Sequence, residues 1–426
     1  MRYVLGIHLG ATRVSAAVCR YRQGGWSPAE VIPLGGPTPW AESVLHVSER
    51  GDLSVGHAAL QRVATEPERV ARAPLHRTGD PVPFVLGELS YPAETLAAGM
   101  IGWVADRVAE VEAAHAERIV VTHPPGWSAY RRGLLHEALD AAELPGVLAL
   151  PSPVAAAECH LARADVEDVE PGRLLAVCAV GGVHVETALL RRTPTGVELL
   201  AHNESSEHEA GCRLDDLVVR YVLDRADVDN GDPYAMGRLR AAALAAKERL
   251  STTTDVFVTD TVSLSRQEFE ELAAPVLRSA VGRLRSLLTH VPEGQLAAAL
   301  LVGGSARIPL AAGLARTMLP CPVVVDDDPG TMRCRGAALV ARPRPRPRPG
   351  AAPDAKPEQT QVAERDDALV PDIGDAPALY DRASRGEDAE PPPRRPPVEI
   401  TPLQPPRRRF SLARGRGPTE DRDEER

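Results

Sequence analysis

The chain has 426 residues, of which 43% are hydrophobic, and is therefore long enough for two domain-sized lobes with apolar cores of their own. Its formal net charge of −10 lies entirely on residues 1–341, because residues 342–426 hold 17 Lys and Arg against 17 Asp and Glu. So acidic a body argues against a nucleic-acid-binding surface. No apolar run approaches ~20 residues, no signal-peptide profile begins the chain and no C-x-x-C pair occurs, so we expect a cytoplasmic protein without a transmembrane segment or zinc site.

The chain begins with an apolar strand, a glycine turn and a second strand at residues 3–20, which predicts a β-hairpin. Apolar residues recur with helical spacing in 94–116, and the β-branched run 118–122 predicts a strand that ends before Pro124. Further helices are expected at 128–142 and 153–164.

The same order starts again at residues 173–191 with strand, Gly-Gly turn and strand. Because hairpin, helix and strand recur in this order, the sequence predicts two similar α/β lobes with a cleft between them, at residues 1–170 and 171–342. The remaining expected elements are helices at 211–225, 236–250 and 266–289, a strand at 297–302, a helix from Pro309, a strand at 322–325 and a helix at 332–341.

Residues 343–426 differ in composition from the rest of the chain. They begin within an alternating Arg-Pro stretch at 342–349, and proline at every second position forbids helix and removes the hydrogen-bond donors of a strand. The segment holds 17 of the 40 prolines. It has too little apolar surface to offset the entropy of ordering it. A disordered C-terminal tail is therefore predicted.

Three glycine turns follow apolar strands, and they indicate phosphate chemistry. Glycine lets the backbone approach a phosphate, and consecutive amides form anion-binding nests. Each turn alone is better explained as an ordinary tight turn, but together, in two repeated lobes, they favour a nucleotide site. The turns are Gly10-Ala11-Thr12, Gly181-Gly182 and Gly303-Gly304-Ser305.

The segment ALLVGGSARIPLAAGL at 299–314 closely resembles the adenosine-binding motif of the heat shock protein 70 family. GIHLGATRVS at 6–15 and VCAVGGVHVE at 177–186 resemble the two phosphate loops of that family, and AAKERLS at 245–251 resembles its ribose helix. The matches are collinear over residues 3–341. The resemblance implies a two-lobed actin-like ATPase fold of the ribonuclease-H-like type, and the GGSARIP string favours this branch over sugar kinases and actin-like filament proteins.

The resemblance also implies ATP or ADP as the ligand. Carried over position by position, it assigns nucleotide binding to Gly10, Ala11, Thr12, Gly181, Gly182, Lys247, Gly303, Gly304, Ser305 and Arg307.

Several positions depart from the family pattern, and most departures remove charge near the metal. His8, Ser152 and Ala179 stand where the family has acidic residues. Only Glu186 keeps its negative charge, in place of an aspartate. The other departures are Ala11 for a threonine, Val183 and His184 for Gly-Thr, Leu244 for a glutamate, Glu248 for an arginine, and Leu75, with His76 and Arg77 adjacent, near the place of a lysine.

These losses predict a protein that binds nucleotide without hydrolysing it. Mg²⁺ prefers carboxylates and water, so their loss argues against Mg²⁺ as a cofactor. Each missing electrostatic group costs roughly 10²–10³ in rate. A slow, active ATPase with chaperone function is the alternative, and a purely structural protein without nucleotide dependence is a third possibility.

His8, His184 and Glu186 are expected to face one another, and they are the candidates for any remaining catalytic role. Two histidines and a carboxylate suit a transition metal. Alternatively, the imidazoles contact phosphate directly, or the three residues drifted after catalysis was lost, which is the reading we favour; no metal site is therefore assigned.

The family pairs its nucleotide-binding domain with a peptide-binding domain through an apolar linker, and here Arg-Pro repeats follow Ala341 instead. We therefore expect a chaperone-like, scaffold or regulatory module that recruits a protein partner, with residues 343–426 as one candidate contact. RRRFSL at 407–412 resembles a kinase substrate with Ser411 as acceptor, and the basic residues of 394–416 suit weak contact with a membrane surface. A solvated, solubilising tail is the simpler interpretation.

Overall fold

The computed structural model describes residues 2–36, 38–164, 169–205, 210–292 and 294–343. The predictions for the tail, including Ser411 and the basic cluster, lie outside the described residues. Within the described residues, no helix is both long and apolar enough to span a bilayer.

The first sheet is mixed and has seven strands in the order β12-β11-β1-β2-β3, with β4 and β5 also paired to β2. The predicted hairpin is confirmed, since β1 and β2 pair antiparallel, while β11 runs parallel to β1. The strands are β1 (Tyr3–Leu9), β2 (Arg13–Arg22), β3 (Gly25–Trp26), β4 (Glu30–Ile32), β5 (Trp40–Glu42), β11 (Arg118–His123) and β12 (Leu148–Pro151).

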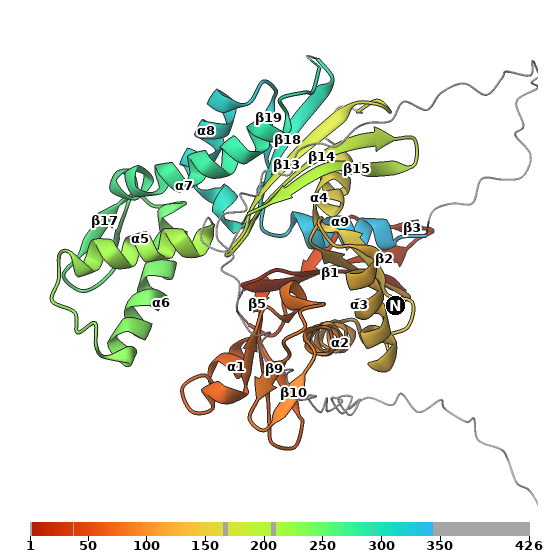
Figure 1. The fold of residues 1–426 in the computed structure, drawn as a ribbon. Helices are drawn as coiled ribbons and strands as arrows, with labels where there is room; N and C mark the ends of the chain where they lie inside the picture. The colour runs from red at the N-terminus through yellow and green to blue at the C-terminus, as the bar shows by residue number, and fades with distance from the viewer. Residues whose placement is uncertain (1, 37, 165–168, 206–209, 293, 344–426) are drawn as a thin grey trace, which may run out of the picture. The chain divides into compact units, whose positions relative to one another are not determined.

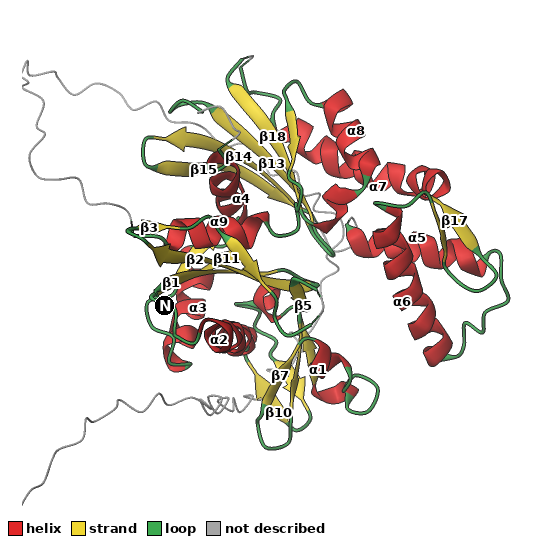
Figure 2. Cartoon of the chain, turned by 180° about the vertical axis from the view of Figure 1, so that it is seen from behind, coloured by secondary structure: helices red, strands yellow, loops and turns green. Residues whose placement is uncertain are grey.

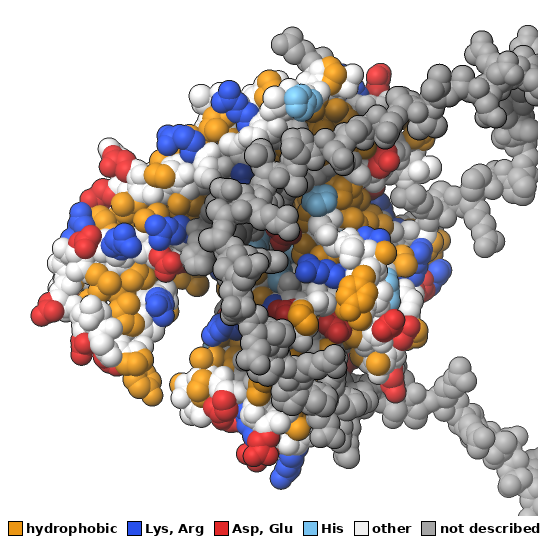
Figure 3. All heavy atoms as spheres, in the orientation of Figure 1, with side chains coloured by type: hydrophobic (Ala, Val, Ile, Leu, Met, Phe, Trp, Pro, Cys, Tyr) orange, Lys and Arg blue, Asp and Glu red, His pale blue; other side chains and the backbone are white. Residues whose placement is uncertain are grey.

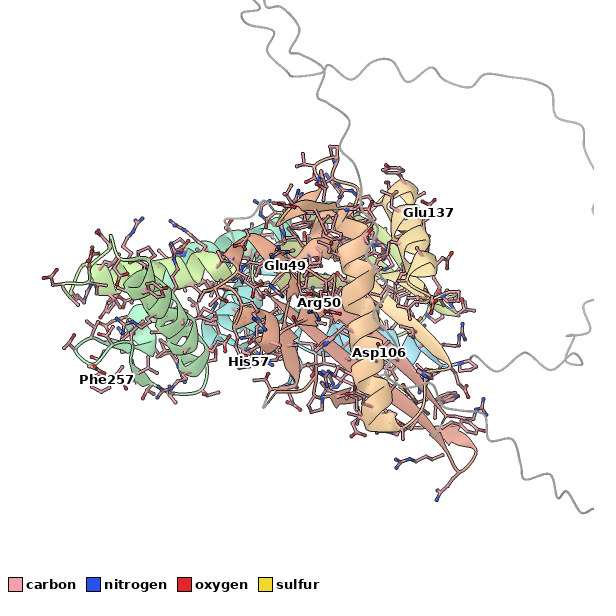
Figure 4. The ribbon with its side chains drawn as sticks, turned by 90° about the horizontal axis from the view of Figure 1, so that it is seen from below. Glu49, Arg50, His57, Asp106, Glu137 and Phe257 are labelled. Carbon is pink, nitrogen blue, oxygen red and sulfur yellow. The ribbon has the colours of Figure 1, made fainter. Side chains whose placement is uncertain are left out.

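Helices α2 (Ala93–Glu112) and α3 (Ala129–Ala141) lie against each other beside this sheet; Figure 4 shows α2, which carries Asp106, next to α3, which carries Glu137. Residues 44–91, for which the sequence made no prediction, add two small sheets and short helices. These are β6 (Val44–Val47), β7 (Leu53–Val55) and β8 (Val70–Arg72), β9 (Phe84–Leu86) and β10 (Leu89–Tyr91), α1 (His57–Leu60), η1 (Pro67–Arg69) and η2 (Pro74–Arg77).

The second sheet has five strands in the order β15-β14-β13-β18-β19. Its strands are β13 (Leu174–Val180), β14 (Val185–Thr193), β15 (Gly196–Glu204), β18 (Leu296–Val302) and β19 (Val323–Val325). The associated helices are α5 (Gly211–Leu223), α6 (Pro233–Leu250), α7 (Arg266–Leu287), η3 (Gly304–Arg307) and α8 (Pro309–Met318). Strands β16 (Asp255–Phe257) and β17 (Ser263–Ser265) form a separate hairpin, and Phe257, the last residue of β16, is exposed (Figure 4).

The two sheets repeat one pairing scheme. In the first, β1 pairs antiparallel with β2 and parallel with β11; in the second, β13 pairs antiparallel with β14 and parallel with β18. His8, near the end of β1, lies opposite Ser15, and Ala179 holds the equivalent place opposite Glu186. The predicted repeat of an α/β unit is therefore confirmed, and His8 and Ala179 are equivalent positions.

Two helices, α4 (Ser152–Leu161) and α9 (Met332–Ala341), lie between the sheets (Figures 1 and 2). Alternate residues of β13 face opposite sides, so that Cys178 packs with α7 while Val177 packs with α4, which explains why the strand is apolar throughout. Helix α4 follows the first sheet but packs mainly on the second, whereas α9 follows the second and packs on β1, β2 and β11 of the first. The crossing ties the two halves together.

The crossing depends on backbone contact at two glycines. A Cβ built on Gly336 of α9 would lie 1.7 Å from the carbonyl oxygen of Ala155 in α4. A Cβ on Gly6 of β1 would lie 2.1 Å from the amide nitrogen of Ala338 in α9. Neither neighbour is a movable side chain, so these positions admit only glycine.

We expect Gly336→Ala to lower the free energy of unfolding by about 3 kcal/mol or more, because α4 and α9 must separate to admit one methyl group. Denaturant unfolding of purified variants measures the loss. Gly237→Ala in α6 is the matched control: nothing lies within 4 Å of its Cβ position, and alanine there stabilises a helix by about 0.5–1 kcal/mol. Equal stability of the two variants would contradict the proposed contact.

Candidate nucleotide-binding site

Two glycine turns end equivalent strands, as the sequence predicts. Gly10–Thr12 connects β1 to β2, and Gly181–His184 connects β13 to β14. The Gly10 amide donates to the carbonyl of Arg13 (2.8 Å) and the Gly181 amide to that of His184 (3.0 Å). Each of these two amides therefore closes its own turn, and that they also hold phosphate stays a prediction. The amides that follow, at Ala11 and Gly182, make no backbone hydrogen bond within the described residues.

The second turn meets the adenosine motif and the ribose helix at one point, Gly211, the first residue of α5. A Cβ on Gly211 would lie 3.0 Å from the Gly181 carbonyl oxygen and 3.3 Å from both the Gly182 Cα and the Ser305 Oγ. Lys247 of α6 donates to the Gly211 carbonyl oxygen (3.1 Å) and pairs with Asp215 of α5 (2.7 Å). Four residues predicted separately from sequence thus converge around a fifth that was not predicted.

The two turns also touch each other. A Cβ on Gly182 would lie 2.3 Å from Thr12 Oγ1, so Thr12 of the first turn lies directly against the second. Close by in the chain, Arg13 forms an ion pair with Glu248 of α6 and stacks on Trp40, with its guanidinium carbon 3.6 Å from the ring centroid. Farther out, Figure 3 shows a notch in the surface between the part built by α6 and the part built by α1.

The adenosine motif forms η3 and the start of α8. Gly303 has a φ of +93°, and a Cβ there would lie 2.5 Å from the Val180 carbonyl oxygen, so glycine is required for the strand to turn. Nothing lies within 4 Å of a Cβ on Gly304, which leaves space beside that residue. Arg307 forms an ion pair with Asp328.

A buried group of polar side chains lies beneath the turns. His8 is 8% exposed; its Nδ1 hydrogen-bonds to Thr122 Oγ1 (2.7 Å), and its Nε2 lies 3.3 Å from the Cβ position of Gly10. Glu186 is 5% exposed and accepts a hydrogen bond from Ser152, the first residue of α4. Arg333 of α9, 8% exposed, has its Nη1 3.6 Å from Glu186 Oε2.

His76 and His184 extend this group across the two halves. Their rings stack with centroids 5.1 Å apart and planes 10° apart. Burial, then the charges of His184 and Arg333, lower the pKa of His76 to about 3. The pKa of His8 is also lowered, first by burial and then by the charges of Arg333 and His76. Both imidazoles are therefore neutral near pH 7, and the charge of Arg333 contributes to both shifts.

Of the three residues near the place of the family's lysine, His76 lies in the buried polar group. Leu75 is instead in the apolar core, and Arg77 pairs with Asp80 on the surface. Glu248 pairs with Arg13, and Leu244 is exposed.

The hypothesis of a transition metal on His8, His184 and Glu186 finds no support in the geometry. Among the described residues, no three His, Cys, Asp or Glu side chains gather closely enough to hold a metal ion. His184 stacks on His76, and Glu186 faces the guanidinium of Arg333. The donor set does not suit Mg²⁺ either, since His8, Ser152 and Ala179 offer no carboxylate.

Sequence reasoning missed Arg333, Gly211 and Asp215. For Arg333 a signal was present: α9 reads MRCRGAALVA, and an arginine in the first turn of so small and apolar a helix must be buried or must extend past the helix end. No sequence signal marked Gly211 or Asp215, because their role depends on how α5 meets α6.

Comparison with known proteins agrees with this geometry. The model of the Hsp70 protein family matches residues 61–342. The chaperone protein HscA of Shigella boydii serotype 18 is 27% identical over 368 residues, covering 80% of this chain and 58% of that protein, and HscA of Escherichia coli O17:K52:H18 gives the same figures. The chain thus spans just over half the length of these relatives.

Two repeated sheets, paired glycine turns and an adenosine motif define a member of the actin-like ATPase class, as the sequence predicts. Within that class the chain belongs to the Hsp70 family, and the match covers its nucleotide-binding region.

The buried histidines predict a loss of stability in mild acid. Since the pKa of His76 is about 3 in the folded chain and ordinarily about 6.5, the unfolded chain binds the extra proton between these values. Stability is therefore full above about pH 6.5 and falls as the pH drops, by up to about 1.4 kcal/mol per pH unit for this one group.

Denaturant unfolding between pH 5 and 7 measures this slope. His76→Gln should flatten this slope. A residual slope should remain, because the pKa values of His8 and His123 are also lowered in the folded chain. His290→Gln, at an exposed position, should leave the slope unchanged. An unaltered slope in His76→Gln would show that His76 protonates equally in both states.

Proposed function

We propose that this chain is an Hsp70-family nucleotide-binding module that binds ATP or ADP. The observation that carries the proposal is the convergence of Gly181, Gly182, Ser305 and Lys247 on Gly211, because loops that share no sequence neighbourhood meet there. The open space beside Gly304 suits a base, and the amides of Ala11 and Gly182 suit phosphates. Gly10, Thr12 and Gly303 shape the turns, and Arg307 flanks the base pocket.

We further propose that hydrolysis is absent or very slow. Hydrolysis in this fold relies on a metal that offsets phosphate charge and on carboxylates that position it. Here His8, Ser152 and Ala179 supply neither, and Glu186 is engaged by Ser152 and Arg333. Losses that act as a unit are not additive, but each is worth roughly 10²–10³ in rate.

The role that follows is a chaperone-like or regulatory scaffold whose two halves respond to bound nucleotide. The relatives are named chaperone proteins, which supports a protein partner. The residues directly after α9 are alternating Arg and Pro, so we do not include a peptide clamp coupled through an apolar linker. Contact with the partner through residues 343–426, with Ser411 as a modification site, remains part of the proposal.

Calorimetric titration of the full chain with ATP and ADP tests binding, and phosphate release tests turnover. We expect micromolar binding without phosphate release above background. No binding up to millimolar nucleotide would overturn the proposal in favour of a nucleotide-independent scaffold. Steady turnover would instead support the alternative, a slow ATPase.

A variant probes the base pocket directly. Gly304→Val places a branched side chain in the open space beside η3, so we expect nucleotide affinity to fall at least about tenfold while stability without nucleotide is kept. Gly237→Val, also in open space but near the other end of α6 from Lys247, is the matched control and should bind as the wild type does. Unchanged affinity in Gly304→Val would place the base elsewhere.

A further inference from the structure

We propose that the guanidinium of Arg333 takes the place of the metal in this site and binds a phosphate group, so that phosphate ligands bind without Mg²⁺. The inference deepens the nucleotide-binding function proposed above and rests on it for the identity of the natural ligand. The chemical class of the ligand is a terminal phosphate group, either the last phosphate of ATP or ADP or inorganic phosphate itself.

The first support is the place of Arg333. It is the second residue of α9, whose first turn also holds Met332, Cys334 and Arg335, and it is 8% exposed, whereas Arg335 pairs with Asp326. Burying a guanidinium costs several kcal/mol unless charges and hydrogen bonds compensate it. A shorter apolar residue would serve the packing of α9 better, so packing alone does not explain an arginine here.

The second support is that Arg333 is only partly paired. Its Nη1 is 3.6 Å from Glu186 Oε2, longer than a hydrogen bond, and the same oxygen already accepts from Ser152. Its Nε is buried and has no hydrogen-bond partner among the described residues. A guanidinium has five N–H donors, so most of its capacity remains for a further acceptor.

The third support is what surrounds it. The charge of Arg333 helps lower the pKa of both His8 and His76, and His8 Nε2 lies 3.3 Å from the Cβ position of Gly10. Glu186 and Ser152 are at the matching end of the second sheet. Arg333 therefore lies beside Glu186, at the end of β14 that adjoins the Gly181–His184 turn, and acts electrostatically on His8 near the other turn; a nucleotide held by those turns would present its phosphates in this region.

The chemistry suits this role. Arginine binds phosphate oxygens through paired N–H donors in a fixed plane, and its charge does not depend on pH in the physiological range. It supplies one positive charge where Mg²⁺ supplies two. Unlike a metal ion, it is part of the chain and does not dissociate from the site. Such a cation favours holding a phosphate over driving its transfer, in agreement with a site that has lost its carboxylates.

Calorimetry on the full chain tests the proposal with four probes: ATP, ADP, adenosine and inorganic phosphate, each in EDTA and in Mg²⁺. For the wild type we expect ATP and ADP affinities that differ less than about threefold between the two buffers. For Arg333→Met we expect ATP and ADP affinities at least about tenfold weaker, with adenosine affinity unchanged.

Two further variants keep the test independent of folding defects. Arg333→Met combined with Glu186→Gln removes both charges, so no carboxylate is left buried alone, and it should show the same selective loss. Arg316→Met, an exposed arginine of α8, is the control and should bind every probe as the wild type does.

The outcomes separate this inference from the proposed function. Nucleotide binding that depends strictly on Mg²⁺, or that survives in both Arg333 variants, overturns the role of Arg333 and leaves the nucleotide function standing. Phosphate binding that needs Arg333, without any binding of ATP, ADP or adenosine, supports Arg333 and overturns the nucleotide function. Absence of binding by all four probes overturns both.

Discussion

The constraint on which the rest of the molecule depends is the backbone contact of α4 and α9 between the sheets. Each helix follows one sheet and packs mainly on the other, and Gly6 and Gly336 bring the chains within a distance that admits no side chain. Helix α4 begins directly after β12 and α9 begins a short loop after β19, and their packing also sets the position of their first residues. Ser152 and Arg333 are delivered to the same place, beneath the glycine turns. The helix contact that holds the halves together therefore also builds the site.

The site itself shows how a symmetric scaffold comes to hold an asymmetric charge pattern. At equivalent register, the first sheet offers His8 opposite Ser15 and Thr122, and the second offers Ala179 opposite Glu186 and Val302. One imidazole and two hydroxyls occupy one side and a single carboxylate the other. In so dry a setting one unmatched charge would be costly, and the guanidinium from α9 offsets it. The repeat of the fold therefore does not extend to the side chains at the equivalent strand ends.

Much of the fold is predictable from the sequence because its signals are local. The apolar strands, their glycine turns and helices such as the predicted 94–116, found at Ala93–Glu112, follow from periodicity. Residues 44–91 form short strands held by tertiary contacts, and no local pattern marks them. The glycine turns were found because glycine is chemically distinctive, but the amides of Gly10 and Gly181 prove to close the turns. Gly211 and Arg333 belong to the site through packing between elements far apart in the chain, which spacing along one segment does not reveal.

The contact between Thr12 and Gly182 has a kinetic consequence. The turns of the two halves are in contact at Thr12 and Gly182, and nearby Arg13 forms an ion pair with Glu248 on α6. A ligand held behind these turns, as the proposed function requires, would leave most readily while they are apart. Its residence time is then governed by how often the halves separate, and by how firmly one exposed ion pair and one threonine hold them, more than by the strength of its own contacts.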